Sequence, residues 1–505
     1  MERIIFNKID YDRYKAIISY CIYGEKESKI VVSNILKKID LKEDNFSMNQ
    51  IDSYIDKLQS YAEKIICRSN PALIMKYCEN LRELYSIRDF PTERLQYMIS
   101  LDEAACWISS LAIKYLEQMP YPMQEDDMKY LYEIFRMSDE MIKKKEYQYI
   151  NSSYSYDLEN AFTPIEDDNL DNFLEDTNSL YGLRGIEEES VINEKLYSKL
   201  EKRKLLPKLI YEKNNQNLLS LMGFTYSDID VLINDFKEKL INRHGDRCIY
   251  NQNHVRIAKG RLFAIFKKKI NEANFKKIIE FLSIKPYSKG QRNDLVRELE
   301  IKCIYEYENE LCFGYNTFIK SLWLIKVLSI CGHFPEVFGF TNKQNQVFVD
   351  AQSDFSTFFS YYIADFLSQK GYILPIKNDC IEVEIKNITL SSGEKLHFND
   401  IDVLALNEKK KILYNLELKY FKGKVYYRAV FTDSLETKKL NSFLERQKIL
   451  QANLADILLE KFGIVDSRGY IVKPVYITAR PNNNTKEIEE YDYNTFKQLI
   501  EEGDL

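Results

Sequence analysis

The chain has 505 residues, of which 45% are hydrophobic and 29% are charged, so it can bury a large core and divide into two to four domains. It contains no apolar run of about 18 residues and no signal-peptide pattern, which argues against a membrane protein and, with nine unpatterned cysteines, predicts a cytoplasmic one. The net charge of −6 excludes a uniformly basic nucleic-acid-binding surface.

Residues 1–162 are predicted to form a helical domain. Apolar side chains recur at spacings of three and four within 51–66 and again within 101–116. Such stripes bury one face of each helix against its neighbours and carry no chemistry by themselves. The functional alternative is that these helices form an adaptor or sensor that docks another protein.

Residues 163–195 are predicted to form an acidic linker or loop. Nine acidic side chains lie between 166 and 189, where Arg184 is the one basic residue, and prolines and glycines interrupt the helical periodicity. A second hypothesis is that this segment mimics DNA and covers a basic groove.

Residues 196–345 are predicted to be helical and partly basic. The stretch 256–292 carries eleven lysines and arginines against two glutamates. A basic helix here could bind phosphates through Lys267, Lys268 and Lys269. The alternative is an amphipathic helix with a solvated, lysine-rich face.

The pattern changes in the last predicted domain, residues 346–505, from helices alone to an α/β arrangement. The expected elements are a helix with its apolar stripe at 355–367, a first strand region at 372–374 and 380–388, strands at 401–406 and 412–420, a helix at 434–462 and a strand at 475–478. Their order is α-β-β-β-α-β. The fold class is therefore a mainly α-helical N-terminal two thirds followed by an α/β domain.

Three side chains in this domain form a candidate catalytic group. On a strand, Glu417 and Lys419 share a face, while Leu418 points to the other. A hairpin turn centred on 409–410 would place Asp402 directly opposite Glu417. Directly opposed residues on paired strands have Cβ atoms about 5 Å apart. Two carboxylates at that distance need a proton or a cation between them, and Mg²⁺ (or Mn²⁺) prefers such oxygen ligands.

This group suits the hydrolysis of phosphodiester bonds. A metal held by Asp402 and Glu417 would polarise the scissile phosphate and lower the pKa of a bound water molecule. Lys419 would stabilise the developing negative charge or orient the attacking water.

At these residues the chain resembles the PD-(D/E)XK nuclease superfamily, which has the restriction-endonuclease-like fold. Its pattern is an acidic residue at the start of one strand and Glu-x-Lys on the next, matched here by Asp402 and by Glu417 with Lys419. The resemblance implies DNA as substrate and Gln447 as a further polar residue at the site. We also expect Lys422 and Lys424 to contact nucleic acid.

The chain departs from the family pattern on the first core helix. Many members carry a glutamate where this chain has Ser360. Asp354, Asp365 and Glu384 are the candidates to replace it as a metal ligand.

We therefore expect a Mg²⁺-dependent DNA endonuclease, with the helical regions serving substrate capture, regulation, homo-oligomerisation or the binding of a protein partner. By analogy with other helical regions fused to this fold, defence against foreign DNA is a plausible role. The alternative is a catalytically inactive nuclease-fold module that binds nucleic acid or a protein partner.

Overall fold

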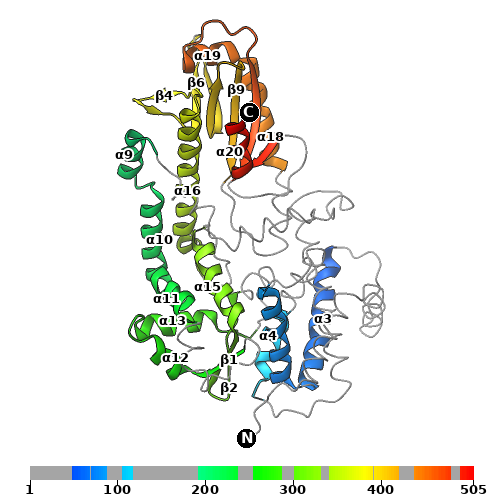
Figure 1. Ribbon diagram of the computed structural model, residues 1–505. Coiled ribbons are helices and arrows are strands. Elements are labelled where there is room, and N and C mark those ends of the chain that lie inside the picture. Colours follow the sequence, from blue (N-terminus) through cyan, green and yellow to red (C-terminus); the bar gives the residue numbers. More distant parts are fainter. Residues whose placement is uncertain are drawn as a thin grey trace. The chain divides into compact units, whose positions relative to one another are not determined.

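The computed structural model describes ten stretches of the chain (Figure 1). They are residues 48–68, 70–87, 105–117, 192–236, 254–286, 301–330, 340–390, 392–419, 437–478 and 489–505. Helices dominate the described N-terminal part, and the C-terminal part combines helices with mixed sheets. The acidic run at 166–189 lies outside the described residues.

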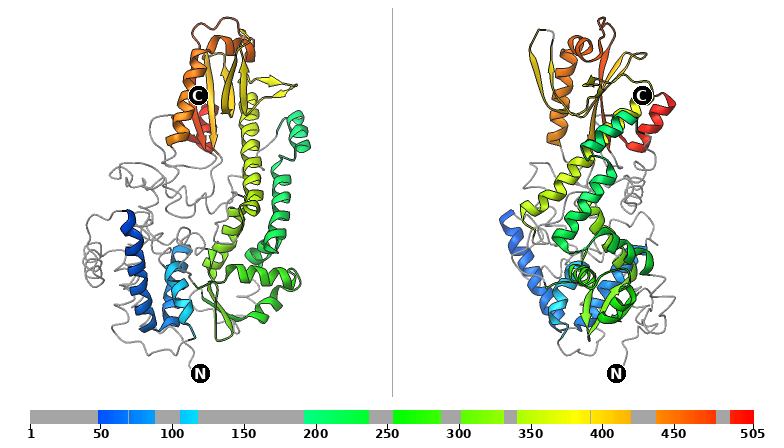
Figure 2. Two further views of the ribbon diagram at one scale, coloured as in Figure 1. Left: turned by 180° about the vertical axis from the view of Figure 1, so that it is seen from behind. Right: turned by 90° about the vertical axis from the view of Figure 1, so that its left-hand side faces the viewer.

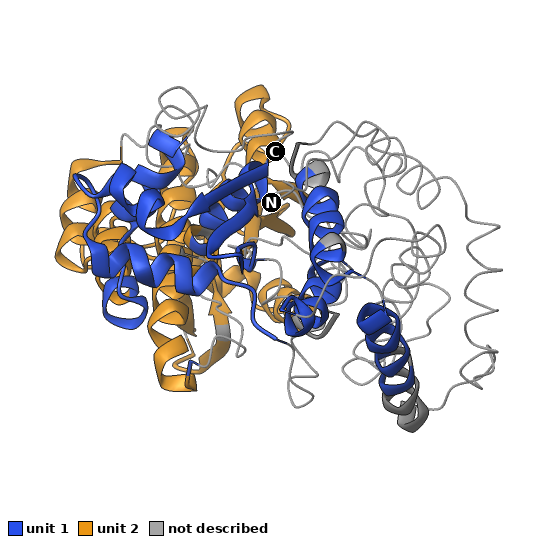
Figure 3. Ribbon diagram, turned by 90° about the horizontal axis from the view of Figure 1, so that it is seen from below, with its two compact units in different colours: residues 1–162, 218–325, 335–340 blue, residues 163–217, 326–334, 341–505 orange. Residues whose placement is uncertain are grey.

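The chain divides into two compact units, coloured separately in Figure 3. Unit 1 contains residues 1–162, 218–325 and 335–340, and unit 2 contains residues 163–217, 326–334 and 341–505. Helices α10 (Pro207–Met222) and α15 (Tyr315–Ile330) contribute residues to both units. Among the described residues, no helix is both long enough and apolar enough to cross a membrane.

The helices predicted in the first domain are confirmed where they are described. Helix α3 (Met48–Arg68) contains the first apolar stripe, and residues 105–112 form a helical segment within the second. Ile66 and Ile108 are fully buried, as an amphipathic stripe requires. The other helices of unit 1 are α4 (Pro71–Ile87), α11 (Tyr226–Phe236), α12 (Lys259–Phe266) and α13 (Glu272–Leu282).

Unit 1 also contains a small antiparallel sheet where only helices were expected. Its strands are β1 (His254–Ala258), β2 (Tyr305–Tyr307) and β3 (Glu310–Gly314), in the order β1-β3-β2. Val255 and Ile257 alternate with more exposed residues along β1, which is the period-two pattern of a half-buried strand. The strands are so short that their alternation could not be distinguished in the sequence from the helical periodicity on either side.

A buried carboxylate links helix α4 to the start of helix α15. Glu83 accepts hydrogen bonds from the backbone N–H groups of Asn316 (2.7 Å) and Thr317 (3.0 Å) and from both side chains (2.8 and 2.9 Å). These donors belong to the first turn of α15, whose N–H groups have no partner within the helix. Glu83 therefore caps a helix that lies more than two hundred residues away in the chain.

The main sheet of unit 2 has the strand order β11-β10-β9-β8. Its strands are β8 (Val403–Asn407), β9 (Ile412–Lys419), β10 (Ile471–Thr478) and β11 (Glu489–Asp492). Strands β8 and β9 are antiparallel, whereas β10 runs parallel to both β9 and β11. Two smaller pairs precede this sheet, β4 (Ile376–Lys377) with β5 (Cys380–Ile381) and β6 (Ile385–Thr389) with β7 (Lys395–Ile401).

Helices pack against this sheet, as the views in Figure 2 show. Helix α16 (Asn342–Gln369) contacts β8 and β9, and helix α18 (Thr437–Ala452) contacts β10. One core cluster joins Leu404 and Leu413 of the sheet to Leu450 of α18 and Ile457 of α19 (Leu454–Phe462). The α-β-β-β-α-β order is thus present, with extra elements.

Three details of unit 2 differ from the sequence prediction. The single helix expected at 434–462 is two helices, because the backbone leaves helical geometry at Asn453 (φ −114°, ψ 23°). The apolar spacing continues across that break, so periodicity alone did not reveal it. Strand β11 and the following helix α20 (Tyr493–Glu502) were not predicted, and β7 extends the strand expected at 401–406.

We predict that Glu83→Ala lowers the free energy of unfolding by roughly 2–4 kcal/mol, because four donors at the start of α15 lose their acceptor. Glu83→Gln should cost less, since its amide oxygen can still accept. Urea denaturation followed by circular dichroism measures both variants. Glu306→Ala, at an exposed position of β2, is the control. Equal stability of the Ala variant and this control would contradict the capping role.

Candidate functional site

The predicted register of the β8–β9 hairpin is confirmed. Val403 pairs with Leu416 and Leu404 with Asn415, which is the alignment that directs Asp402 toward Glu417. Regular pairing ends at Val403, and Asp402 is the single residue between β7 and β8. The candidate site therefore lies where one strand is interrupted beside the end of β9.

The interruption fixes the side chain of Asp402. Its Oδ2 accepts a hydrogen bond of 2.6 Å from the backbone N–H of Leu418, at a position where β8 no longer pairs with β9. Its backbone carbonyl accepts a hydrogen bond of 3.0 Å from the N–H of Glu384. Strand β10 continues to pair with β9 as far as Lys419, so the end of β9 is held from its other side.

Glu417 is buried, with 8% of its surface exposed, between two cations. Lys419 Nζ donates to its Oε1, and a terminal nitrogen of Arg446 donates to its Oε2. Burial raises the pKa of Glu417, but the charges and hydrogen bonds of Lys419 and Arg446 outweigh burial and leave the pKa below its ordinary value. Glu417 is thus ionised at neutral pH.

Asp402 has the opposite electrostatic character. Burial and the neighbouring Glu417 charge raise the pKa of Asp402 to about 7, and Lys419, Arg446 and the Leu418 N–H offset only part of this. A carboxylate whose ionised form is this unfavourable takes up a proton or a cation near neutral pH. Burial lowers the pKa of Lys419, but Glu417 and Asp402 more than compensate, so the pKa is raised and the ammonium stays charged.

Arg446 and Asp400 are site residues that the sequence analysis did not single out. Arg446 is 9% exposed and also donates to the backbone carbonyl of Asp400. Its guanidinium carbon lies 5.0 Å from the centroid of the Phe443 ring. Asp400 Oδ1 is buried and has no hydrogen-bond partner among the described residues. Burial and the Glu384 charge raise the pKa of Asp400. The weak signal in the sequence was proximity, since each residue lies within two positions of a predicted one.

Both the oxygen and the nitrogen of the Gln447 side-chain amide form hydrogen bonds. Its Oε1 accepts from Asn415 Nδ2 (3.1 Å), and its Nε2 donates to the carbonyl of Val472 (2.7 Å). These bonds join helix α18 to β9 and β10. A catalytic role for Gln447 stays a prediction, and its contacts are those of a residue that positions the helix.

The candidates to replace the missing helix glutamate differ in whether they contact the candidate site. Ser360 bonds the carbonyl of Ser356 within α16. Asp354 pairs with Lys213 (2.9 Å), and Asp365 accepts from the N–H of Asn193 (3.3 Å) and from Gln369 (2.8 Å). Glu384 is the candidate with a contact to the site, through its N–H bond to Asp402, while its carboxylate accepts from the hydroxyl of Thr357 (2.6 Å).

The donor set can accommodate a hard divalent cation. Among the described residues, no three His, Cys, Asp or Glu side chains form a cluster that could hold a metal. Mg²⁺ commonly uses one or two carboxylates together with water and substrate phosphates, so a larger cluster is not required. Asp402, with its raised pKa, and the unbonded oxygen of Asp400 are oxygen donors of the appropriate kind.

The lysines predicted to bind nucleic acid are described only in part. Lys267, Lys268 and Lys269 are all exposed after the end of α12, and Lys269 also pairs with Asp235 (2.6 Å). The basic stretch is therefore divided among β1, α12 and α13 and is not a single helix. Lys422 and Lys424 lie outside the described residues.

Comparisons with protein-family models, curated proteins and solved structures found no match to this chain. Function must therefore be inferred from the residues of the site.

We predict that Asp402→Asn stabilises the metal-free protein at pH 8 but not at pH 4. The folded pKa of about 7 exceeds the unfolded value of about 4, so the wild type loses stability as the pH rises between these values. The variant lacks this loss, and its advantage should be on the order of 2–4 kcal/mol. Thermal denaturation in EDTA across this pH range measures it, with the exposed Asp379→Asn as control. A constant difference between wild type and variant at all pH values would contradict the prediction.

Proposed function

We propose that unit 2 carries a metal-dependent nuclease that hydrolyses phosphodiester bonds, with DNA as its substrate. The observation that supports this most directly is the convergence of Asp402, Glu417 and Lys419 at the interruption between β7 and β8. The order of helix α16, the strands up to β9, helix α18 and strand β10 agrees with what the PD-(D/E)XK resemblance implies. The choice of DNA follows from that resemblance.

In the proposed mechanism, Asp402 and Glu417 would hold Mg²⁺ or Mn²⁺, and Asp400, two residues before Asp402, would assist. When bound, such an ion polarises the scissile phosphate and makes a bound water molecule a better nucleophile. The Leu418 N–H fixes the orientation of the Asp402 carboxylate, so it needs no rearrangement to meet a cation.

Lys419 and Arg446 have different tasks in this mechanism. Lys419 is partly exposed and stays protonated, so its ammonium group can stabilise the negative charge that develops on the phosphate. Arg446 is buried and bonded both to Glu417 and to the Asp400 carbonyl, so it positions the carboxylates. A guanidinium group suits this role because its planar donors reach two acceptors at once.

A second candidate function is an inactive module of the same architecture that binds nucleic acid or a protein partner. It is favoured by the contacts of Glu417, whose two oxygens are both engaged by cations of the protein. The serine at position 360 in place of a helix glutamate points the same way. The wider proposals of a cytoplasmic enzyme of defence against foreign DNA, with helical regions that bind a partner or a second copy, rest on analogy alone.

The test is cleavage of supercoiled plasmid, single-stranded DNA and RNA in Mg²⁺, Mn²⁺ or EDTA. We expect metal-dependent cleavage of DNA by the wild type and a loss of at least about 100-fold in Asp402→Ala and Lys419→Ala, since each removes charge at the reacting phosphate. Lys409→Ala, at an exposed position of the hairpin turn, should retain full activity.

Cleavage that persists in both site variants would overturn the proposal. If the wild type does not cleave, its melting temperature in Mn²⁺ decides between the two functions, because an ion that binds only the folded state must stabilise it. A rise that Asp402→Ala abolishes would indicate a metal site, and no rise would favour the inactive module.

A further inference from the structure

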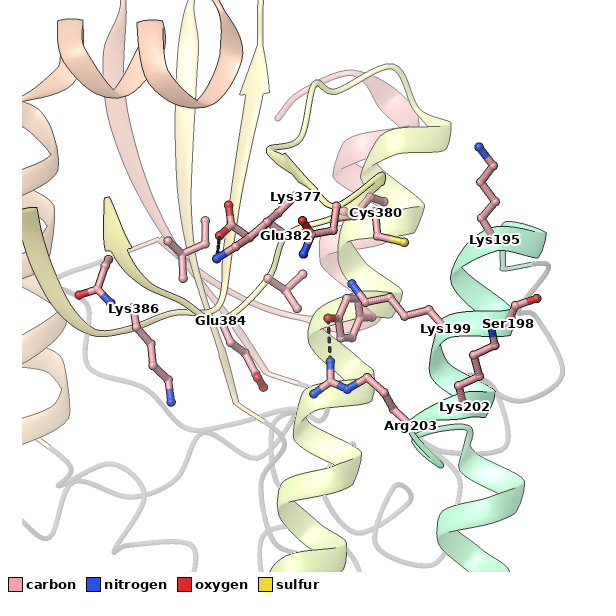
Figure 4. Close-up of a pocket in the computed structure, with 16 residues that line it drawn as sticks. Lys195, Ser198, Lys199, Lys202, Arg203, Lys377, Cys380, Glu382, Glu384 and Lys386 are labelled. Carbon is pink, nitrogen blue, oxygen red and sulfur yellow. Dashed lines mark hydrogen bonds and ion pairs between the residues drawn. The ribbon is translucent and has the colours of Figure 1, made fainter. Parts of the chain in front are cut away.

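A basic groove of about 820 Å³ lies in unit 2, and among its lining residues it shares Glu384 with the candidate site. We define it by the six cationic side chains in its lining, Lys195, Lys199, Lys202, Arg203, Lys377 and Lys386 (Figure 4). The first four come from helix α9 (Glu194–Lys202) and its C-terminal end, and the other two from the β4–β6 region. None of them was predicted to bind anything.

The groove has an excess of uncompensated positive charge. Two carboxylates offset part of this charge: Glu382 pairs with Lys461 (2.6 Å) and Lys377 (3.5 Å), and Glu384 accepts a hydrogen bond from the hydroxyl of Thr357 (2.6 Å). Within the described part of the chain, no carboxylate forms an ion pair with Lys195, Lys202 or Lys386. Clustered positive charges repel one another and destabilise the folded protein unless an anion binds among them.

The groove adjoins the candidate catalytic site through the start of β6. Glu384 lines the groove, and its backbone N–H bonds the carbonyl of Asp402. Lys386, two residues further, also lines the groove (Figure 4). The groove and the main chain of Asp402 are therefore linked through Glu384.

Helix α9, which carries most of these cations, is held in place before any ligand binds. Asn193 caps the helix by accepting from the N–H of Lys195 (3.0 Å), and its own N–H donates to Asp365 of α16 (3.3 Å). At the other end, Arg203 donates to the hydroxyl of Tyr361 of α16 (2.9 Å). A site that is already formed loses little conformational entropy on binding.

The lining favours phosphates over bases. Tyr361 is its one aromatic residue among those described, and it is only 4% exposed. Lys199 Nζ lies 4.9 Å and the Arg203 guanidinium carbon 5.8 Å from the centroid of its ring. A base or nucleoside would need a free aromatic face for stacking. Lysines on flexible stems instead contact phosphates without reading sequence.

We propose that the basic groove binds the sugar–phosphate backbone of a nucleic-acid strand, independently of base sequence, and leads that strand to Asp402. This inference rests on the proposed function, because it assigns the groove to the substrate of that site. DNA and RNA offer the same phosphodiester chemistry to these lysines, so both belong in the test.

The experiment measures the affinity of full-length protein for fluorescein-labelled 20-nucleotide DNA and RNA strands, two sequences of each, by fluorescence anisotropy in EDTA. The groove variant is Lys195→Glu/Lys202→Glu. The control is Lys208→Glu/Lys343→Glu, which changes the net charge equally at exposed positions of unit 2 outside the groove. Lys195→Gln/Lys202→Gln is a milder variant, and melting temperatures verify that each protein is folded.

We expect the groove variant to bind at least about tenfold more weakly than the control and to reduce the slope of log affinity against log salt by about two, one for each lost phosphate contact. Both sequences should be affected equally. Affinity equal to that of the control, or a loss confined to one sequence, would overturn the proposal. Displacement of the oligonucleotide by inorganic phosphate at the same concentration as the oligonucleotide would also overturn the proposal. A strand that contacts several cations at once should bind more tightly than a single phosphate ion.

The two proposals fail in distinguishable ways. Asp402→Ala should bind strands as the wild type does, because it leaves the six cations in place. Weak binding by the groove variant, with no cleavage by the wild type and no rise of its melting temperature in Mn²⁺, would retain the groove and reject the nuclease. Metal-dependent cleavage that Asp402→Ala abolishes, with undiminished binding by the groove variant, would retain the nuclease and reject the groove.

Discussion

The buried carboxylate of Glu417 is the interaction on which the rest of the candidate site depends. It lies on β9 between Lys419 of the same strand and Arg446 of α18, so one charge joins the helix to the sheet. A buried carboxylate deprived of one partner costs several kcal/mol, which makes this arrangement hard to alter piecemeal. Arg446 then carries the connection to the Asp400 carbonyl. The position of α18 and the path of the chain into Asp402 are thereby linked.

This pairing also explains why two neighbouring carboxylates behave differently. Glu417 receives both cations and has a lowered pKa, while Asp402 is left with one backbone donor and a raised pKa. Groups whose environments separate their pKa values in this way are typical of catalytic centres, although structural ion pairs do the same. The asymmetry assigns the roles within the proposed mechanism. Both carboxylates would hold the metal ion, but Glu417 is already partly neutralised by Lys419 and Arg446, whereas Asp402 still requires a cation.

The sequence predicted those parts of the structure that depend on local pattern. A polar turn centred on 409–410 was sufficient to give the register of the β8–β9 hairpin, because the length of a hairpin turn fixes which residues of the two strands pair. Arg446 could not be assigned in this way, since its partner lies 29 positions away on another element. The groove is further still from local prediction, because it combines α9 with strands nearly two hundred residues later. Long-range contacts of this kind leave no periodic trace.

The distribution of charge reconciles an acidic chain with a proposed polyanionic substrate. A net charge of −6 describes the field far from the protein, where salt screens it within about 10 Å. In the basic groove of unit 2, six cations stand against two carboxylates, of which Glu382 is paired with Lys461, so an approaching phosphate would meet an excess of positive charge. The charge of Lys386 also acts on the carboxyl group of Asp400, whose ionised form would repel a bare phosphate. In the proposed mechanism, a phosphodiester would therefore meet the cations of the groove first, and it would approach Asp402 closely only when a metal ion neutralises the carboxylates. The same arrangement would make binding independent of metal and cleavage dependent on it.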